Sequence, residues 1–169
     1  MVTAVMPTYA RKDVVFERGE GSYLFATDGR RYVDFTSGIA VNNLGHCHPQ
    51  LVKTLQDQAA KLWHTSNLFR IGNGEKLAER LVANSFADTM FFCNSGAEAI
   101  EGGIKLIRKY QYVTGKPKRY KLICFQAAFH GRLLNALAAT GNEKYLEGFG
   151  PPAAGYMHAP LNNTNVVRD

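Results

Sequence analysis

The sequence predicts an α/β fold, because short apolar stretches alternate with a helical pattern along its second half. Residues 89–94 (TMFFCN) and 120–126 (YKLICFQ) are typical of buried strands, and residues 96–114 between them have helical spacing. A strand, a helix and a strand in this order indicate a parallel sheet covered by helices, with ligands at the carboxyl ends of the strands. We therefore expect the first strand–helix–strand part of a parallel-sheet domain.

The N-terminal part has the alternation of a small antiparallel sheet. Residues 14–35 contain two strand-like stretches on either side of Asp28-Gly29, a dipeptide that favours a tight hairpin turn. Residues 36–50 are rich in Gly, Asn and His and are predicted to form a loop. The last residues, 162–169, are predicted to contain neither a helix nor a strand.

Two amphipathic helices are predicted between these parts. The first covers Pro49–Trp63, since proline suits a first helical turn and the apolar residues recur at helical spacing. The second follows the break at Gly72 and Gly74. Its expected inward-facing residues are Leu77, Leu81 and Val82.

The composition is that of a soluble globular protein. The chain has 169 residues, of which 46% are hydrophobic and 20% charged, and its longest apolar runs are far shorter than a membrane span. No secretory leader pattern is present at the start, so we expect a cytoplasmic protein without a membrane partner. Three widely spaced cysteines, Cys47, Cys93 and Cys124, suggest reduced thiols, the last two as inert core residues within strands.

Nucleic-acid binding and metal binding are both disfavoured. The formal charge of +6 is spread along the chain except for residues 116–121 (KPKRYK), which we interpret as a solvated loop. The triplet His46, Cys47 and His48 has ligands too close together to complete a tetrahedral site, and no second cluster supplies the others. We expect no metal and no nucleic-acid partner.

Small residues mark the point where the first predicted strand leads into its helix. Ser95 followed by Glu98 forms a capping box, which explains these two residues by local structure alone. Gly96 and Ala97 leave a bare backbone at the positive end of the helix, which is what a phosphate group requires. The dinucleotide and Walker patterns are both absent from the sequence, so capping and phosphate binding remain the alternatives.

A second group of residues follows the next predicted strand. Phe129 can stack on a flat heterocycle and Arg132 can bind a carboxylate with two parallel hydrogen bonds. The structural alternatives are a core position for Phe129 and a surface position for Arg132.

Five ordered segments give the chain a family resemblance. LGHCHPQLV, LWHTSNLF, FFCNSGAEA, FHGR and KYLEGFGP resemble the class III pyridoxal-phosphate aminotransferases, most closely their acetylornithine aminotransferase branch. The resemblance implies a partial fold type I structure. Residues 1–48 would form the N-terminal segment whose hairpin contributes to the small domain, and 49–169 would begin the large cofactor-binding domain.

The resemblance also implies roles for individual residues. Ser95, Gly96 and Ala97 would hold the phosphate of pyridoxal 5'-phosphate, Phe129 would stack on its pyridine ring, and Arg132 would bind the carboxylate of the amino-acid substrate. Family members are homodimers with sites built across the interface. The departures from the family are Ile100 in place of Asn, Gly102 and Gly103 in place of alanines, and Leu133 in place of Thr or Ser.

The implied activity is transfer of an amino group from N-acetylornithine to 2-oxoglutarate in arginine biosynthesis. Ornithine, 4-aminobutyrate or succinyl-diaminopimelate are alternative donors. In the family the Schiff-base lysine comes from the second half of a longer chain, and none of the ten lysines here has that context. We therefore expect an N-terminal portion that is inactive alone, with a non-catalytic fragment or dimerisation module as the alternative.

Overall fold

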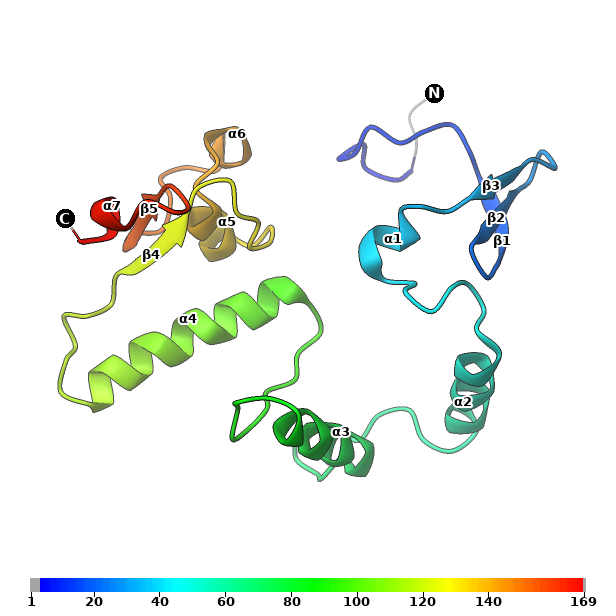
Figure 1. Cartoon of the computed structure of the whole chain (residues 1–169), viewed down its shortest axis with the longest axis horizontal. Coiled ribbons are helices and arrows are strands. Elements are labelled where there is room, and N and C mark those ends of the chain that lie inside the picture. Colours follow the sequence, from blue (N-terminus) through cyan, green and yellow to red (C-terminus); the bar gives the residue numbers. More distant parts are fainter. Residues whose placement is uncertain (1–3, 169) are drawn as a thin grey trace. The chain divides into compact units, whose positions relative to one another are not determined.

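The structure, a computed structural model, describes residues 4–168 and contains two compact units, Met1–Gly72 and Asn73–Asp169 (Figure 1). The predicted boundary after His48 refers to the domains of the whole family fold and stays a prediction. Within residues 4–168, no helix combines the length and apolar character needed to span a membrane.

The first unit is built on a three-stranded antiparallel sheet. Its strands β1 (Phe16–Glu20), β2 (Tyr23–Ala26) and β3 (Arg31–Val33) lie in chain order. The predicted hairpin at Asp28-Gly29 joins β2 to β3 and is confirmed. The prediction of only two strands is wrong, because a further turn at Gly21, where φ is +53°, separates β1 from β2.

A hydrogen-bonded contact between Asp34 and His46 fixes the loop that follows this sheet. Asp34 accepts hydrogen bonds from the backbone N–H groups of Thr36 and Ser37, and its Oδ2 lies 2.8 Å from His46 Nε2. The Asp34 side chain is only 5% exposed. A short helical segment, α1 (Ser37–Ala40), lies inside the predicted loop, but its backbone includes left-handed conformations and is not a regular helix.

Asp34 makes the stability of this unit depend on pH. Hydrogen bonds from Thr36 and the contact with His46 lower the pKa of the Asp34 carboxyl to about 2, from an ordinary value of 3.8. Because the carboxylate is favoured in the folded state, it stabilises the fold fully above about pH 4. This stabilisation is lost as the pH falls from about 4 toward 2.

We therefore expect Asp34→Asn to reduce the fall in stability between about pH 4 and pH 2. The measurement is urea unfolding followed through the sheet amide signals in two-dimensional NMR. Asp57→Asn is the control, because Asp57 forms only an exposed ion pair with Lys53. Equal pH dependence in the wild type and Asp34→Asn would contradict the assignment.

The two predicted helices exist but differ in detail. Helix α2 (Pro49–Ala59) ends before the predicted Trp63, and α3 (Gly72–Ala83) begins at the predicted break. Leu77 and Leu81 of α3 are exposed, so the prediction that they face inward is wrong for this structure, whereas the third predicted residue, Val82, is half-buried. An apolar stripe becomes buried only when another element covers it, and none covers these two leucines here.

The predicted strand at 89–94 does not form. The segment has no regular secondary structure and no strand partner within residues 4–168, and Phe91, Phe92 and Cys93 are exposed. A strand requires a neighbour that accepts and donates its backbone hydrogen bonds, which an apolar pattern alone cannot supply. The prediction that Cys93 is a core thiol is therefore wrong, whereas Cys124 is buried as expected.

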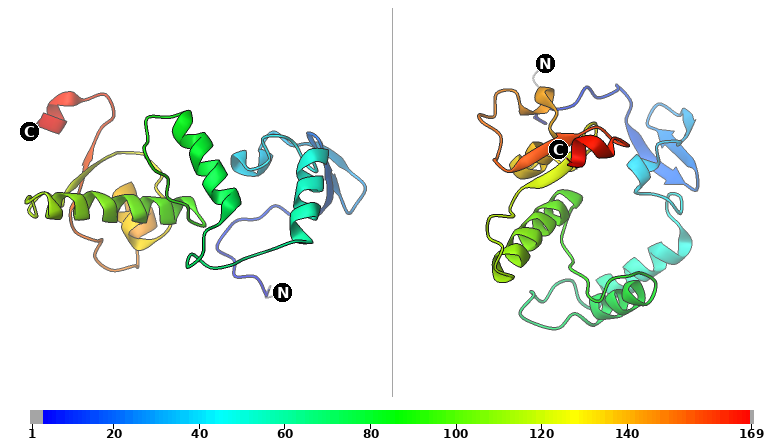
Figure 2. Two further views of the ribbon diagram at one scale, coloured as in Figure 1. Left: turned by 90° about the horizontal axis from the view of Figure 1, so that it is seen from below. Right: turned by 60° about the vertical axis from the view of Figure 1, so that its left-hand side comes forward.

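The second unit contains a long helix and a parallel strand pair. Helix α4 (Gly96–Val113) is continuous despite Gly102 and Gly103, as all three views show (Figures 1 and 2). Strand β4 (Leu122–Phe125) confirms the predicted strand at 120–126. It pairs in parallel with β5 (Tyr156–Ala159), which the sequence reading missed.

Helix α5 (Leu134–Thr140) is the centre of this unit. It contacts α4, both strands and α6 (Glu143–Leu146), and its residues 136–140 are all buried. Small side chains explain this position, because Ala136, Ala138 and Ala139 allow close approach from several sides. A last helix, α7 (Thr164–Arg168), corrects the prediction that residues 162–169 lack regular structure.

Candidate functional site

The N-terminus of α4 keeps free hydrogen-bond donors. Ser95 is the N-cap residue and its Oγ accepts from the backbone N–H of Glu98 at 3.2 Å. Glu98 does not complete the predicted capping box, because its carboxylate accepts from the N–H of Asn94 at 2.6 Å. The N–H groups of Ser95, Gly96 and Ala97 have no acceptor among residues 4–168. Three donors thus remain at the positive end of an 18-residue helix.

The segment after β4 packs directly against this helix end. Gly131 has φ +124°, and a Cβ built on it would lie 2.7 Å from the Cβ of Ala97. Only glycine permits this approach. The structure therefore brings together the two segments that the sequence singled out. The contact joins the loop before α5 to the start of α4 and does not depend on neighbouring strands, since residues 89–94 form no strand.

A buried threonine holds the loop that carries Gly131. Thr140 Oγ1 accepts from the backbone N–H of His130 at 3.1 Å and donates to the carbonyl oxygen of Ala136 at 2.9 Å. Thr140 is 4% exposed and lies in the last turn of α5. The bond to Ala136 is buried and the bond from His130 is partly buried, and together they tie the loop to the core of the unit. Sequence reasoning missed this residue, which follows three apolar or small residues and resembles ordinary core.

A second network connects α5 to α4 and β5. The Asn135 amide donates to Glu101 at 3.0 Å, and the Tyr156 hydroxyl donates to Asn135 Oδ1 at 3.2 Å. Burial raises the pKa of the Tyr156 phenol, and nearby Arg108 acts in the opposite direction. These bonds fix the start of α5, where Leu133 stands at the N-cap without a capping side chain. The Thr or Ser that the class III aminotransferases commonly have at this position would supply a capping oxygen.

Phe129 and Arg132 project from the same loop. The Phe129 side chain is 69% exposed, so its ring is not a core residue. The guanidinium carbon of Arg132 lies 5.9 Å from the centre of the Phe129 ring and 4.3 Å from that of Tyr145 in α6. Arg132 has no carboxylate partner among residues 4–168. Sequence reasoning does not single out Tyr145, although it belongs to the KYLEGFGP segment.

These groups fit a phosphate-bearing aromatic cofactor and a carboxylate. Free N–H groups at a helix N-terminus bind phosphate oxygens, an exposed ring can cover a flat heterocycle, and an unpaired guanidinium binds carboxylates. The Glu98 carboxylate opposes an anion nearby, yet it is already engaged by the N–H of Asn94, upstream of the free donors. The residues present therefore suit pyridoxal 5'-phosphate.

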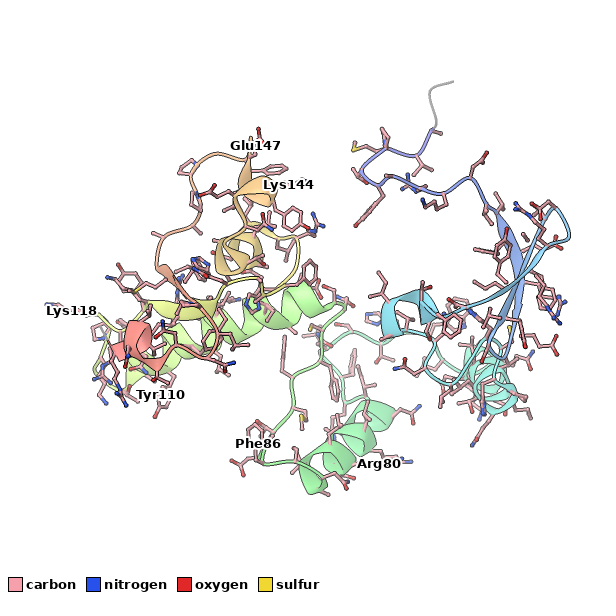
Figure 3. All side chains as sticks on the ribbon, turned by 45° about the horizontal axis from the view of Figure 1, so that its top comes forward. Arg80, Phe86, Tyr110, Lys118, Lys144 and Glu147 are labelled. Atoms are coloured by element: carbon pink, nitrogen blue, oxygen red, sulfur yellow. The ribbon has the colours of Figure 1, made fainter. Side chains whose placement is uncertain are left out.

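The metal, nucleic-acid and cysteine candidates from the sequence gain little support from the structure. Within the described part of the chain, His, Cys, Asp and Glu form no group of three or more that could hold a metal ion. The basic residues of 116–121 are exposed in the loop after α4, where Figure 3 shows Lys118 beyond Tyr110 of the helix. Cys47 and Cys93 are exposed free thiols, and burial raises the pKa of Cys124.

Comparison with known sequences points to one activity class. The chain is 60% identical over 164 residues to acetylornithine aminotransferase 1 of Bradyrhizobium diazoefficiens, covering 97% of this chain and 40% of the relative. It is 55% identical over 161 residues to the acetylornithine aminotransferase of Brucella suis, covering 95% and 40%. The chain thus spans about two fifths of the length of these relatives.

Solved structures agree with the sequence relatives. The ornithine aminotransferase of Toxoplasma gondii matches with a TM-score of 0.89 and 26% identity, over 97% of this chain and 39% of that one. The N-acetylornithine aminotransferase of Stenotrophomonas maltophilia matches with a TM-score of 0.75 and 37% identity, over 95% and 38%. The fold is thus that of part of an aminotransferase, as the sequence predicted. Residues 5–169 match the class III aminotransferase family, and the chain belongs to that family.

Proposed function

We propose that this chain is the cofactor-phosphate and substrate-carboxylate part of an aminotransferase that uses N-acetylornithine as amino donor and 2-oxoglutarate as acceptor, in arginine biosynthesis. The observation that carries the proposal is the contact between Gly131 and Ala97, which places the Phe129–Arg132 loop beside the free donors of α4. Relatives named acetylornithine aminotransferase at 60% and 55% identity support the choice of donor.

In this proposal the start of α4 binds the phosphate of pyridoxal 5'-phosphate. The N–H groups of Ser95, Gly96 and Ala97 donate to phosphate oxygens, and the helix dipole favours the negative charge. Gly96 is exposed, and a Cβ on it would meet nothing within 4 Å, so the approach to its backbone is open. Phe129 covers one face of the pyridine ring and excludes water from that face.

Arg132 binds the carboxylate of the amino-acid donor and, in the second half of the reaction, of the acceptor. Its guanidinium can form two parallel hydrogen bonds to a carboxylate, which orients the substrate as well as attracting it. When bound, pyridoxal 5'-phosphate withdraws electrons from the substrate α-carbon and so allows its proton to be removed. The groups of this chain bind and orient, whereas proton transfer needs a lysine from the part of the relatives that this chain does not match.

The proposal also covers the activity of the chain alone and the assembly of the complete enzyme. The 169-residue chain alone does not transaminate, because the catalytic lysine has no counterpart among its ten lysines. The complete enzyme is a homodimer, as the family resemblance implies, and a cytoplasmic location with neither a nucleic-acid nor a membrane partner follows the expectation from the sequence pattern.

The decisive assay uses the protein extended to the length of its relatives. Amino transfer to 2-oxoglutarate is measured with N-acetylornithine, ornithine, 4-aminobutyrate and succinyl-diaminopimelate at matched concentrations. We expect the highest kcat/KM with N-acetylornithine. Preference for ornithine is the second candidate, favoured by the structural match to the Toxoplasma gondii ornithine aminotransferase. A higher kcat/KM with any other donor contradicts the acetylornithine assignment.

A non-catalytic module is the alternative from another functional class. It predicts that even the extended protein does not turn over any of the four donors. Binding of pyridoxal 5'-phosphate to the 169-residue chain, followed by the absorption of the cofactor, is measured beside the assay. Binding that is lost in Gly96→Val but kept in Gly103→Ala supports the phosphate role of the α4 N-terminus whichever donor is used.

A further inference from the structure

The guanidinium of Arg132 is held by aromatic rings rather than by an acid. Its carbon lies 4.3 Å from the centre of the Tyr145 ring and 5.9 Å from that of Phe129. No hydrogen bond or ion pair of Arg132 to any residue in 4–168 accompanies these contacts. A cation at 4.3 Å from a ring centre is within the range of cation–π attraction.

A cation–π contact of this kind can orient an arginine without using its donors in hydrogen bonds. A ring attracts the face of the guanidinium, whereas all five N–H groups point outward in the plane of the group. A carboxylate neighbour within the protein would have neutralised the charge and occupied two of those donors. The Tyr145 contact therefore restrains a long, flexible side chain whose N–H groups have no partner among residues 4–168.

The backbone between the two residues is built to bring them together. Helix α5 ends at Gly141, whose φ of +65° reverses the chain, and Asn142 then caps α6 by accepting from the N–H of Lys144 at 3.1 Å. The N–H of Tyr145 donates to the carbonyl oxygen of Asn142 at 2.9 Å. Tyr145 is half-buried while Arg132 is exposed, so the ring is the fixed partner of the pair.

We propose that Tyr145 is a positioning residue, which holds the Arg132 guanidinium with its N–H edge toward the substrate carboxylate. The proposal rests on the carboxylate-binding role of Arg132 stated under Proposed function and names the residue that sets its orientation. It follows that the ring of residue 145 matters and its hydroxyl does not. Phenylalanine should replace Tyr145 and leucine should not.

The test uses the 169-residue chain and glutarate, an unreactive dicarboxylate. The Arg132 Nε–H resonance, assigned by its loss in Arg132→Lys, reports the stack, because a ring over the guanidinium shifts it upfield. We expect this shift in the wild type and in Tyr145→Phe, and its loss in Tyr145→Leu. The dissociation constant for glutarate should rise about two- to fivefold in Tyr145→Leu, the range of an exposed cation–π contact.

Tyr112→Leu is the matched control. The Tyr112 ring lies beside Lys109 on the exposed surface of α4 with 5.5 Å between the ammonium nitrogen and the ring centre. The loss of this ring should leave both the Arg132 resonance and glutarate binding unchanged. Should Tyr145→Leu disturb the backbone amide spectrum, the test rests on the position of the Arg132 Nε–H resonance in the wild type, whose assignment needs only Arg132→Lys.

Three results would overturn the inference. They are an Arg132 resonance at its unfolded position in the wild type, equal glutarate affinity of the wild type and Tyr145→Leu, and no glutarate binding by the wild type. The proposed function fails separately, if the chain does not bind pyridoxal 5'-phosphate. Glutarate binding that depends on the residue 145 ring would then still support a carboxylate site positioned by Tyr145.

Discussion

Replacing Gly131 by alanine is expected to lower the free energy of unfolding of the second unit by about 3 kcal/mol and to abolish pyridoxal 5'-phosphate binding. The backbone of Gly131 has φ +124°, which residues with a side chain avoid, and its added methyl group would lie 2.7 Å from the Cβ of Ala97. Ala97 is in the first turn of α4, so relief of this clash must displace either the loop or the helix end to which we assign the cofactor phosphate. Urea unfolding followed by circular dichroism and a cofactor titration measure the two effects.

Gly103→Ala is the control for Gly131→Ala. Gly103 lies within α4, and a Cβ there would meet nothing within 4 Å. Alanine at this helical position should stabilise the unit by about 0.5 to 1 kcal/mol and leave cofactor binding intact. Gly102 is less suitable, since its Cβ would lie 3.2 Å from the ring of Phe91. If Gly131→Ala binds the cofactor like the wild type, the close contact of loop and helix has no role in the site.

Gly141→Ala is expected to destabilise the second unit by about 3 kcal/mol or more, again measured by urea unfolding. Gly141 has φ +65°, and a Cβ on it would overlap the ring of His158. That ring cannot move freely, because its Nε2 lies 3.0 Å from the carbonyl oxygen of Ala139. Displacement of His158 would disturb the packing of β5 on α5, and the turn that brings Tyr145 over Arg132 would shift with it.

Gly115→Ala separates the cost of a left-handed backbone from the cost of the overlap with His158. Gly115 also has a left-handed backbone, with φ +76°, but a Cβ there would meet nothing within 4 Å. Gly115→Ala should therefore lower the free energy of unfolding only by the cost of placing alanine in a left-handed conformation, about 1 to 2 kcal/mol. Adding His158→Ala to Gly141→Ala should recover part of the difference, since the overlapping ring is gone. Equal losses in Gly141→Ala and Gly115→Ala would show that the contact with His158 is unimportant.

Local rules were sufficient for some elements of the chain. Helix α4 and its Ser95 cap follow from helical spacing and from one side-chain oxygen, both of which are properties of neighbouring residues. The Asp28-Gly29 hairpin likewise needs only its own turn residues. For Phe129 and Arg132 the sequence suggested the chemistry through residue type, although it left core and surface alternatives open.

Other elements depended on partners distant in sequence. Residues 89–94 have the same apolar character as β4, yet only β4 forms a strand, because β5 pairs with it from more than 30 residues away. Leu77 and Leu81 have the spacing of a buried face and remain exposed, because burial requires a covering surface. Thr140 and Asn135 act through bonds across the fold, and their sequence neighbours carry no sign of this.

The sequence by itself determined that this chain belongs to an α/β protein of the class III aminotransferase family, and which residue types could bind a phosphate and a carboxylate. Only the tertiary structure decided that Gly131 contacts Ala97 and that the Tyr145 ring lies over Arg132. The reason is physical: side-chain chemistry and local conformation are encoded in adjacent residues, whereas contacts between segments arise from the packing of the whole unit around α5.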